Sequence, residues 1–144
     1  METINKNNFK ALFNKAIELR DSSLYKEAID ILNNLLKSGI YKSAIYGVLG
    51  GIYYDLKEYE NSERCYQNVI SVKPKSELAS LGLFHSLFNL GKYKEAFNEM
   101  DRYLNINEPD NYRITIQELY EQINNNTPKY QKEIIEKHYN KLTY

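Results

Sequence analysis

Apolar residues recur every three or four positions along most of this chain, in segments separated by short polar or glycine-containing breaks. The segment "ELASLGLFHSLFNL" (77–90) shows this pattern at Leu83, Leu87 and Leu90, and Gly91 follows it. The spacing is typical of one face of an α-helix, and glycine commonly follows the last helical residue. The next segment, "YKEAFNEMDRYLNI" (93–106), has the same spacing. Two short helices cannot bury their apolar faces alone, so the pattern predicts helix pairs stacked on neighbouring pairs.

The pattern repeats every 34 residues. Three segments align, "LYKEA" (24–28), "EYENS" (58–62) and "KYKEA" (92–96), and their tyrosines Tyr25, Tyr59 and Tyr93 lie 34 residues apart. Three further sets keep the same interval: Ala28, Ser62 and Ala96; Leu32, Tyr66 and Met100; Leu19, Tyr53 and Leu87. Agreement over four registers indicates an internal repeat, which is the sequence signature of a solenoid.

The repeated unit resembles the tetratricopeptide repeat, with units at 9–42, 43–76 and 77–110. The second unit is the best match: Tyr46, the pair Leu49-Gly50, Tyr53 and Pro74 occupy the aromatic, Leu-Gly, aromatic and closing proline positions of the family. The first unit has no proline, and the third has Phe84 where the family has a small residue. The resemblance implies an all-α fold, a right-handed superhelix of helix pairs forming a single domain.

The C-terminal segment, 111–144, follows the family pattern poorly. Pro109 predicts the start of a helix that runs to about Asn124, and "NNNT" then interrupts it. Thr127 and Pro128 predict the start of a last helix over 128–143. Its apolar stripe consists of Tyr130, Ile134, Ile135, His138 and Leu142. We interpret 111–144 as a degenerate fourth pair that caps the stack, the alternative being that the last helix folds back into a groove.

The charge balance and the N-terminus narrow the class of protein. Lys and Arg together number 19, as do Asp and Glu, so no net charge favours binding to nucleic acid or an anionic membrane. The first ten residues lack the pattern of a signal peptide, and the apolar stretch from Ile45 to Tyr54 is too short to span a bilayer. The single cysteine, Cys65, has no partner for an intramolecular disulfide. We therefore expect a cytoplasmic protein.

The sequence contains no motif typical of an enzyme. His85 and His138 lie in different units, outside any metal-ligand spacing, and "GVLGG" (47–51) lacks the lysine of a phosphate-binding loop. Cys65 has no histidine near it in the sequence. We expect no catalytic residue, no cofactor and no metal site.

The resemblance implies a concave groove lined by the first helix of each unit. The family's groove positions fall mostly on apolar and aromatic residues of this chain: Lys10, Phe13, Ile17, Arg20, Ala44, Gly47, Gly51, Tyr54, Leu78, Gly82, His85, Phe88, Tyr112, Thr115 and Leu119. Family members that grip a C-terminal carboxylate of chaperones use a clamp of Lys, Asn and Arg. This chain has Phe13, Ile17, Val48, Leu78 and Gly82 at the clamp positions, so an Hsp70 or Hsp90 co-chaperone role is not expected.

The glycines of the second unit have separate interpretations. Each glycine inside a helix costs roughly 1 kcal/mol relative to alanine. Gly50 takes the small-residue position where the two helices of a unit cross. Gly47 and Gly51 face the groove with Gly82 beside them, which predicts a bare floor walled by Phe13, Tyr54 and Phe88.

These observations favour a protein–protein interaction module that binds a peptide or amphipathic helix of a partner in an apolar groove, as an adaptor or chaperone-like protein. The alternative is a structural or scaffold subunit that oligomerises through its terminal helices, with no groove ligand. A homodimer also stays open, because a second copy of the chain would cover an apolar groove. An enzyme ranks third.

Overall fold

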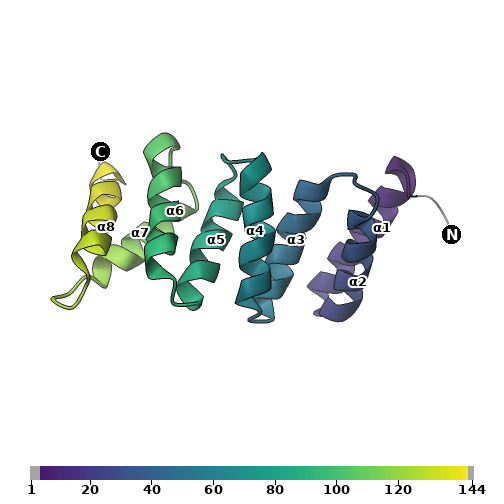
Figure 1. The fold of residues 1–144 in the computed structure, drawn as a ribbon, viewed down its shortest axis with the longest axis horizontal. Helices are drawn as coiled ribbons and strands as arrows, with labels where there is room; N and C mark the ends of the chain where they lie inside the picture. The colour runs from purple at the N-terminus through teal and green to yellow at the C-terminus, as the bar shows by residue number, and fades with distance from the viewer. Residues whose placement is uncertain (1–3, 143–144) are drawn as a thin grey trace.

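The computed structural model describes residues 4–142 and forms eight α-helices with no strand in that range. The helices are α1 (Lys6–Asp21), α2 (Tyr25–Leu36), α3 (Lys42–Asp55), α4 (Tyr59–Val72), α5 (Glu77–Asn89), α6 (Tyr93–Ile106), α7 (Tyr112–Glu121) and α8 (Lys129–Leu142). They follow one another along the long axis of the molecule, from α1 and α2 at one end to α7 and α8 at the other (Figure 1). The prediction of an all-α solenoid is confirmed.

The turn inside each of the first three helix pairs repeats with the same period as the sequence. Ser23, Lys57 and Gly91 lie 34 residues apart and have positive φ angles of 61°, 61° and 76°. In each turn the next residue donates its N–H to a carbonyl five residues back, as Glu58 does to Tyr53 at 2.8 Å. This left-handed turn ends the first helix and satisfies its last carbonyls. The third turn has the glycine that this backbone conformation favours.

The buried side chains form two apolar clusters that meet at α4. One cluster joins the first two helix pairs and includes Leu32, Leu49 and Cys65. The other joins the third pair to the C-terminal pair and includes Phe84 and Met100. Cys65 belongs to the first cluster, whereas the next residue, Tyr66, packs against the second. The two halves of the stack therefore both pack against α4, through neighbouring residues that point in different directions.

Two fully buried serines connect α3, α4 and α5 at the same level. The hydroxyl oxygens of Ser62 and Ser86 lie 2.7 Å apart, and each hydroxyl also lies within hydrogen-bonding distance of a glycine carbonyl, Gly50 at 3.0 Å and Gly82 at 2.8 Å. Two hydroxyl hydrogens serve three contacts, so only one of the two carbonyl bonds forms at a time. Either arrangement keeps both hydroxyls bonded inside an apolar region, where an unsatisfied one would be costly.

A carboxylate from the third pair caps the first helix of the C-terminal pair. The Glu77 side chain accepts hydrogen bonds from the backbone N–H groups of Asp110 (2.7 Å), Asn111 (2.6 Å) and Tyr112 (3.4 Å). The unpaired N–H groups at a helix start and the helix dipole both favour an anion there. This cap fixes the start of α7 at Tyr112, and the helix ends at Glu121, before the predicted Asn124.

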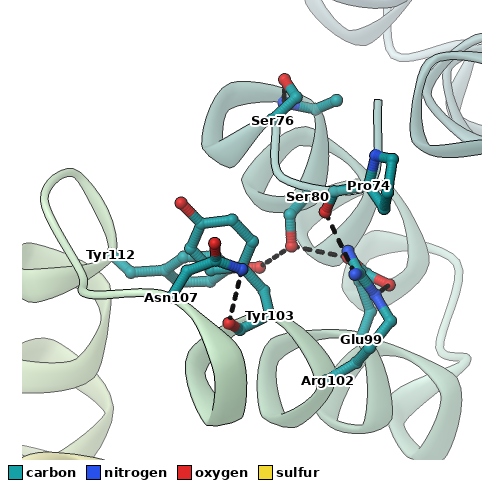
Figure 2. A network of polar contacts seen from close by, with 9 residues as sticks. Pro74, Ser76, Ser80, Glu99, Arg102, Tyr103, Asn107 and Tyr112 are labelled. Atoms are coloured by element: carbon teal, nitrogen blue, oxygen red, sulfur yellow. Dashed lines mark hydrogen bonds and ion pairs between the residues drawn. The ribbon is translucent and has the colours of Figure 1, made fainter. Parts of the chain in front are cut away.

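A polar network behind that cap joins α7 to α5 and α6 (Figure 2). The Ser80 hydroxyl donates to the Glu99 carboxylate at 2.6 Å and lies 2.8 Å from the Tyr112 hydroxyl, which therefore donates to Ser80. Arg102 donates to both carboxylate oxygens of Glu99 and to the carbonyl of Pro74 at 3.1 Å. The network connects the loop before α5 with three helices, so the C-terminal pair has a defined orientation on the stack.

The last helix packs against α6 and α7, not along the first helices of the earlier pairs. Ile135 and His138 of its predicted stripe are buried. His138 Nε2 lies 2.8 Å from Asp101 Oδ1 of α6, and Lys137 Nζ contacts the same oxygen at 2.6 Å. The alternative in which α8 folds back into a groove is therefore wrong, because the apolar stripe of α8 is already covered.

We predict that acid weakens this docking between pH 7 and pH 5. Burial lowers the pKa of His138 below its ordinary value; the hydrogen bond to Asp101 opposes this shift, while Lys137 and Lys141 add to it. A histidine whose pKa is lower in the folded state stabilises the fold above about pH 6.5, and this contribution is lost as the pH falls. Thermal unfolding should therefore show a melting temperature that falls from pH 7 to pH 5, and His138→Gln should reduce that fall.

His85→Gln is a second test variant, because burial also lowers the pKa of His85, and it should reduce the fall in melting temperature as well. The double variant should show the least pH dependence. A His138→Gln protein that loses as much stability as the wild type over this range would contradict the assignment.

Candidate binding groove

Two adjoining hollows lie along α3 and α5, and together we call them the central groove. The first, about 420 Å³, is lined mainly by apolar residues: Arg20, Ser43, Ala44, Gly47, Val48, Tyr66, Val69, Lys73, Ser76, Leu78 and Ala79. The second, about 370 Å³, is lined by Tyr54, Tyr66, Leu78, Leu81, Gly82 and His85. Tyr66 and Leu78 line both. Leu78 is 72% exposed, a large apolar side chain left facing solvent between the two hollows.

Tyr66 reaches the groove from α4 through a slot between α3 and α5. A β-carbon placed on Gly50 would lie 2.9 Å from the Tyr66 ring, and one placed on Gly82 would lie closer still. Both distances are too short for real side-chain contacts, so the ring needs glycine on each side. A β-carbon on Gly51 would lie 3.6 Å from the Tyr66 hydroxyl, an ordinary contact. The ring thus fills the slot, and its hydroxyl lies near Gly51.

The glycines therefore differ in what they do. Gly50 lies at a close helix contact, as its position in the repeat predicts. Around Gly47 a β-carbon would meet nothing within 4 Å, so the floor is open there. Gly82 lines the second hollow, but the Tyr66 ring occupies the space next to it, so the floor is not bare at that point. Gly47 is thus the glycine with open space beside it in the first hollow, whereas Gly51 lines neither hollow and lies next to the Tyr66 hydroxyl.

The second hollow has an aromatic wall. The rings of Tyr54 and His85 lie edge to face, with centroids 6.4 Å apart, and the Tyr54 hydroxyl accepts a hydrogen bond from Asn89 at 3.1 Å. Burial lowers the pKa of His85, opposed by the charge of Glu118, so its imidazole is neutral at pH 7. The wall presents a flat, uncharged surface.

Several predicted groove residues lie outside the two hollows. Phe13 and Ile17 of α1 are partly buried, and Phe13 stacks on Phe9 with ring centroids 5.7 Å apart. Phe88 is 36% exposed beside Tyr93. Tyr112 is wrong as a ligand contact, because it is fully buried and its hydroxyl is bonded to Ser80. It became part of the core because the C-terminal pair packs over the third pair at this point.

The groove also contains residues that the repeat pattern did not assign to it: Tyr66 and Val69 of the outer helix α4, and Lys73 directly after it. A signal for Tyr66 was present. It stands at the register that Leu32 and Met100 occupy in the other units, and it is the one aromatic residue there. A larger ring at a repeated core position needs space, and Gly50 and Gly82 provide it.

The chemistry of the groove is that of a binding surface. Arg20 pairs with its neighbour Asp21 at 3.0 Å, and no ion pair involves Lys73 within the described residues. Burial raises the pKa of the Cys65 thiol to about 11, so the thiol is protonated.

Within residues 4–142 no group of three or more His, Cys, Asp or Glu side chains could hold a metal ion. No described helix is long and apolar enough to cross a bilayer.

A larger hollow, about 530 Å³, lies at the C-terminal end of the stack, where residues 104–109 meet α7 and α8. Its lining is more polar and includes Arg113, Lys141 and His138. His138 is already bonded to Asp101, and the Arg113 side chain donates to the Pro109 carbonyl at 3.2 Å. Because these groups serve the docking of α7 and α8, the central groove is the better candidate site.

Comparisons with known proteins agree with this architecture. Residues 43–76 match the family model of the tetratricopeptide repeat. Intraflagellar transport protein 70A of Xenopus tropicalis is 35% identical over 72 residues, which are 50% of this chain and 11% of that protein. An N-terminal acetyltransferase A complex subunit-like protein of Schizosaccharomyces pombe is 30% identical over 93 residues, 59% of this chain and 13% of that protein. The chain thus matches only a small part of each relative.

A solved structure described as MamA RS-1 ArsTM double mutant has a TM-score of 0.76 at 16% sequence identity, covering 96% of this chain and 75% of that one. This likeness shows the fold. The stacked pairs define an all-α helical repeat protein, and the match at 43–76 identifies the repeat. Residues 43–76 form a tetratricopeptide repeat, within a stack of helix pairs that has the same architecture. Such repeats generally mediate protein–protein interaction, and their fold is typically a non-enzymatic scaffold.

We predict opposite effects of alanine at two glycines of this surface. Gly82→Ala should destabilise the protein by about 1–3 kcal/mol, because its β-carbon would overlap the Tyr66 ring, which also lies against Gly50. Gly47→Ala should leave stability unchanged or raise it by up to about 1 kcal/mol through helix propensity. Urea unfolding of both variants measures the difference. Equal stability of the two variants would contradict the packing of Tyr66 between the glycines.

Proposed function

We propose that the central groove binds an apolar segment of a partner protein, so that the chain acts as an adaptor or a chaperone-like protein. The observation that carries the proposal is the open floor at Gly47 beside the largely exposed Leu78. Glycine inside a helix is unfavourable, and exposed leucine side chains cost hydrophobic free energy. A ligand that covers both residues explains why this helix keeps a glycine at a position where a side chain would fit.

The outer surface of the last helix supports this proposal over self-association through the ends of the stack. Exposed residues of α8 are mostly charged, and two lysine–glutamate pairs lie along it, Lys129 with Glu133 at 3.8 Å and Lys132 with Glu136 at 3.9 Å. Interfaces between identical chains are usually more apolar than the rest of the surface. The central groove is the more suitable surface for a protein ligand.

The test begins with selection of binders from a displayed library of random 12-residue peptides. Recovered peptides are then measured by fluorescence anisotropy against the wild type and two variants. Gly47→Leu fills the first hollow and should weaken binding at least tenfold, which corresponds to about 1.4 kcal/mol. Ala11→Leu, at an exposed position of α1, is the matched control and should bind as the wild type does.

Chemical-shift changes on adding a selected peptide should map to the residues of the central groove. Recovery of no binding peptide, equal binding to Gly47→Leu, or shift changes confined to another surface would each overturn the proposal. Thermal unfolding of each variant shows whether a loss of binding accompanies a loss of structure.

A further inference from the structure

The Tyr66 hydroxyl has no hydrogen-bond partner among the described residues. The other tyrosine that lines the groove does have a partner, since the Tyr54 hydroxyl accepts a hydrogen bond from Asn89. Both hollows of the central groove include Tyr66 in their lining. The hydroxyl therefore lies where the two hollows meet, on a surface that is largely apolar.

Two helices restrict the position of this hydroxyl. The Tyr66 ring lies close to Gly50 of α3 and Gly82 of α5, so close that a β-carbon on either glycine would clash with it. Desolvation and the negative charge of Asp55 raise the pKa of Tyr66 to about 12, so the hydroxyl keeps its proton at neutral pH and can donate. A rigid donor of this kind costs little conformational entropy when it forms a hydrogen bond with a ligand.

We propose that the occupant of the central groove is an extended segment of a partner protein, and that the Tyr66 hydroxyl donates a hydrogen bond to a main-chain carbonyl of that segment. The inference rests on the proposed function and specifies how the segment is recognised. Tyr66 is then the residue that selects an extended main chain, while the hollows on either side of it take apolar side chains.

The geometry favours an extended segment over a helix. A helix uses its carbonyls in its own hydrogen bonds and presents only side chains to a groove, whereas an extended strand has free carbonyls. Gly51 lies next to the hydroxyl and Gly47 lies one helical turn away in the first hollow, and neither has a side chain to keep a main chain away. A covered hydroxyl without an acceptor would be penalised, so a ligand that buries Tyr66 must supply one.

The basic side chains at the first hollow indicate the charge of the segment that binds there. Lys73 lines the first hollow without an ion pair among the described residues, and the Arg20 guanidinium lies at the same hollow. Asp21 neutralises the charge of Arg20 through an ion pair, so Lys73 is the cation of this hollow that has no acidic partner among the described residues. We therefore expect a carboxylate in the part of the segment that lies over the first hollow.

The first experiment measures selected 12-residue peptides against Tyr66→Phe, with Tyr120→Phe as the matched control on α7. Tyr66→Phe should bind about tenfold more weakly, as expected for one lost hydrogen bond to a desolvated carbonyl. Its melting temperature should be equal to or higher than that of the wild type, because the deleted hydroxyl has no partner in the free protein. Tyr120→Phe should change neither affinity nor the selected sequences.

The second experiment changes the peptide rather than the protein. Each amide of one selected peptide is replaced in turn by an ester, which makes the neighbouring carbonyl a weaker acceptor. One position should lose affinity for the wild type, and the same replacement should have no effect with Tyr66→Phe, which shows that the two changes remove one shared interaction.

The outcomes separate the two proposals. If Gly47→Leu abolishes binding but Tyr66→Phe binds within twofold of the wild type, the groove binds peptides and the role of Tyr66 is overturned. Selected peptides that bind as helices, seen from their nuclear Overhauser effects, would overturn the extended segment. Selected peptides without acidic residues would contradict the expected carboxylate. If no peptide is recovered or Gly47→Leu binds normally, the proposed function itself fails.

Discussion

The packing of the Tyr66 ring between Gly50 and Gly82 is the constraint on which the centre of this molecule depends. A side chain on either glycine would occupy the space of the ring. Because α4 contributes Cys65 to one apolar cluster and Tyr66 to the other, this contact lies where the two halves of the stack meet. The two glycines lower the intrinsic stability of their helices, and the close approach of three helices offsets that cost. The same contact carries a phenolic hydroxyl from an outer helix to the surface of the groove.

Polar contacts give the stack its register where apolar packing alone would permit sliding. Ser62 and Ser86 connect the helices around Tyr66, and Glu77 places the start of α7. Within the described residues every buried side-chain nitrogen or oxygen has a hydrogen-bond partner. The Tyr66 hydroxyl has no partner among these residues and is therefore not one of the buried atoms, so it is open to hydration in the free protein. A ligand that displaces this water must replace its hydrogen bond.

Local sequence patterns predicted the parts of the fold that depend on local interactions. The 34-residue period, the helices and the position of Gly50 all follow from short-range spacing. Contacts between units were harder to predict, because they depend on how far one pair rotates over the next. Tyr112 was assigned to the groove although the C-terminal pair buries it, and Gly82 was assigned to a bare floor although it accommodates a side chain from α4. Family positions identify which helix lines a groove, but they do not show which side chains of the second helix pass between the first helices.

The groove combines an open floor, a largely exposed leucine, an aromatic wall and one fixed hydroxyl. Nuclear Overhauser effects in the free protein measure the packing of Tyr66 directly. We expect contacts from the ring protons of Tyr66 to the α-protons of both Gly50 and Gly82. Contacts to neither glycine, or to only one of them with the ring turned toward solvent, would contradict this packing.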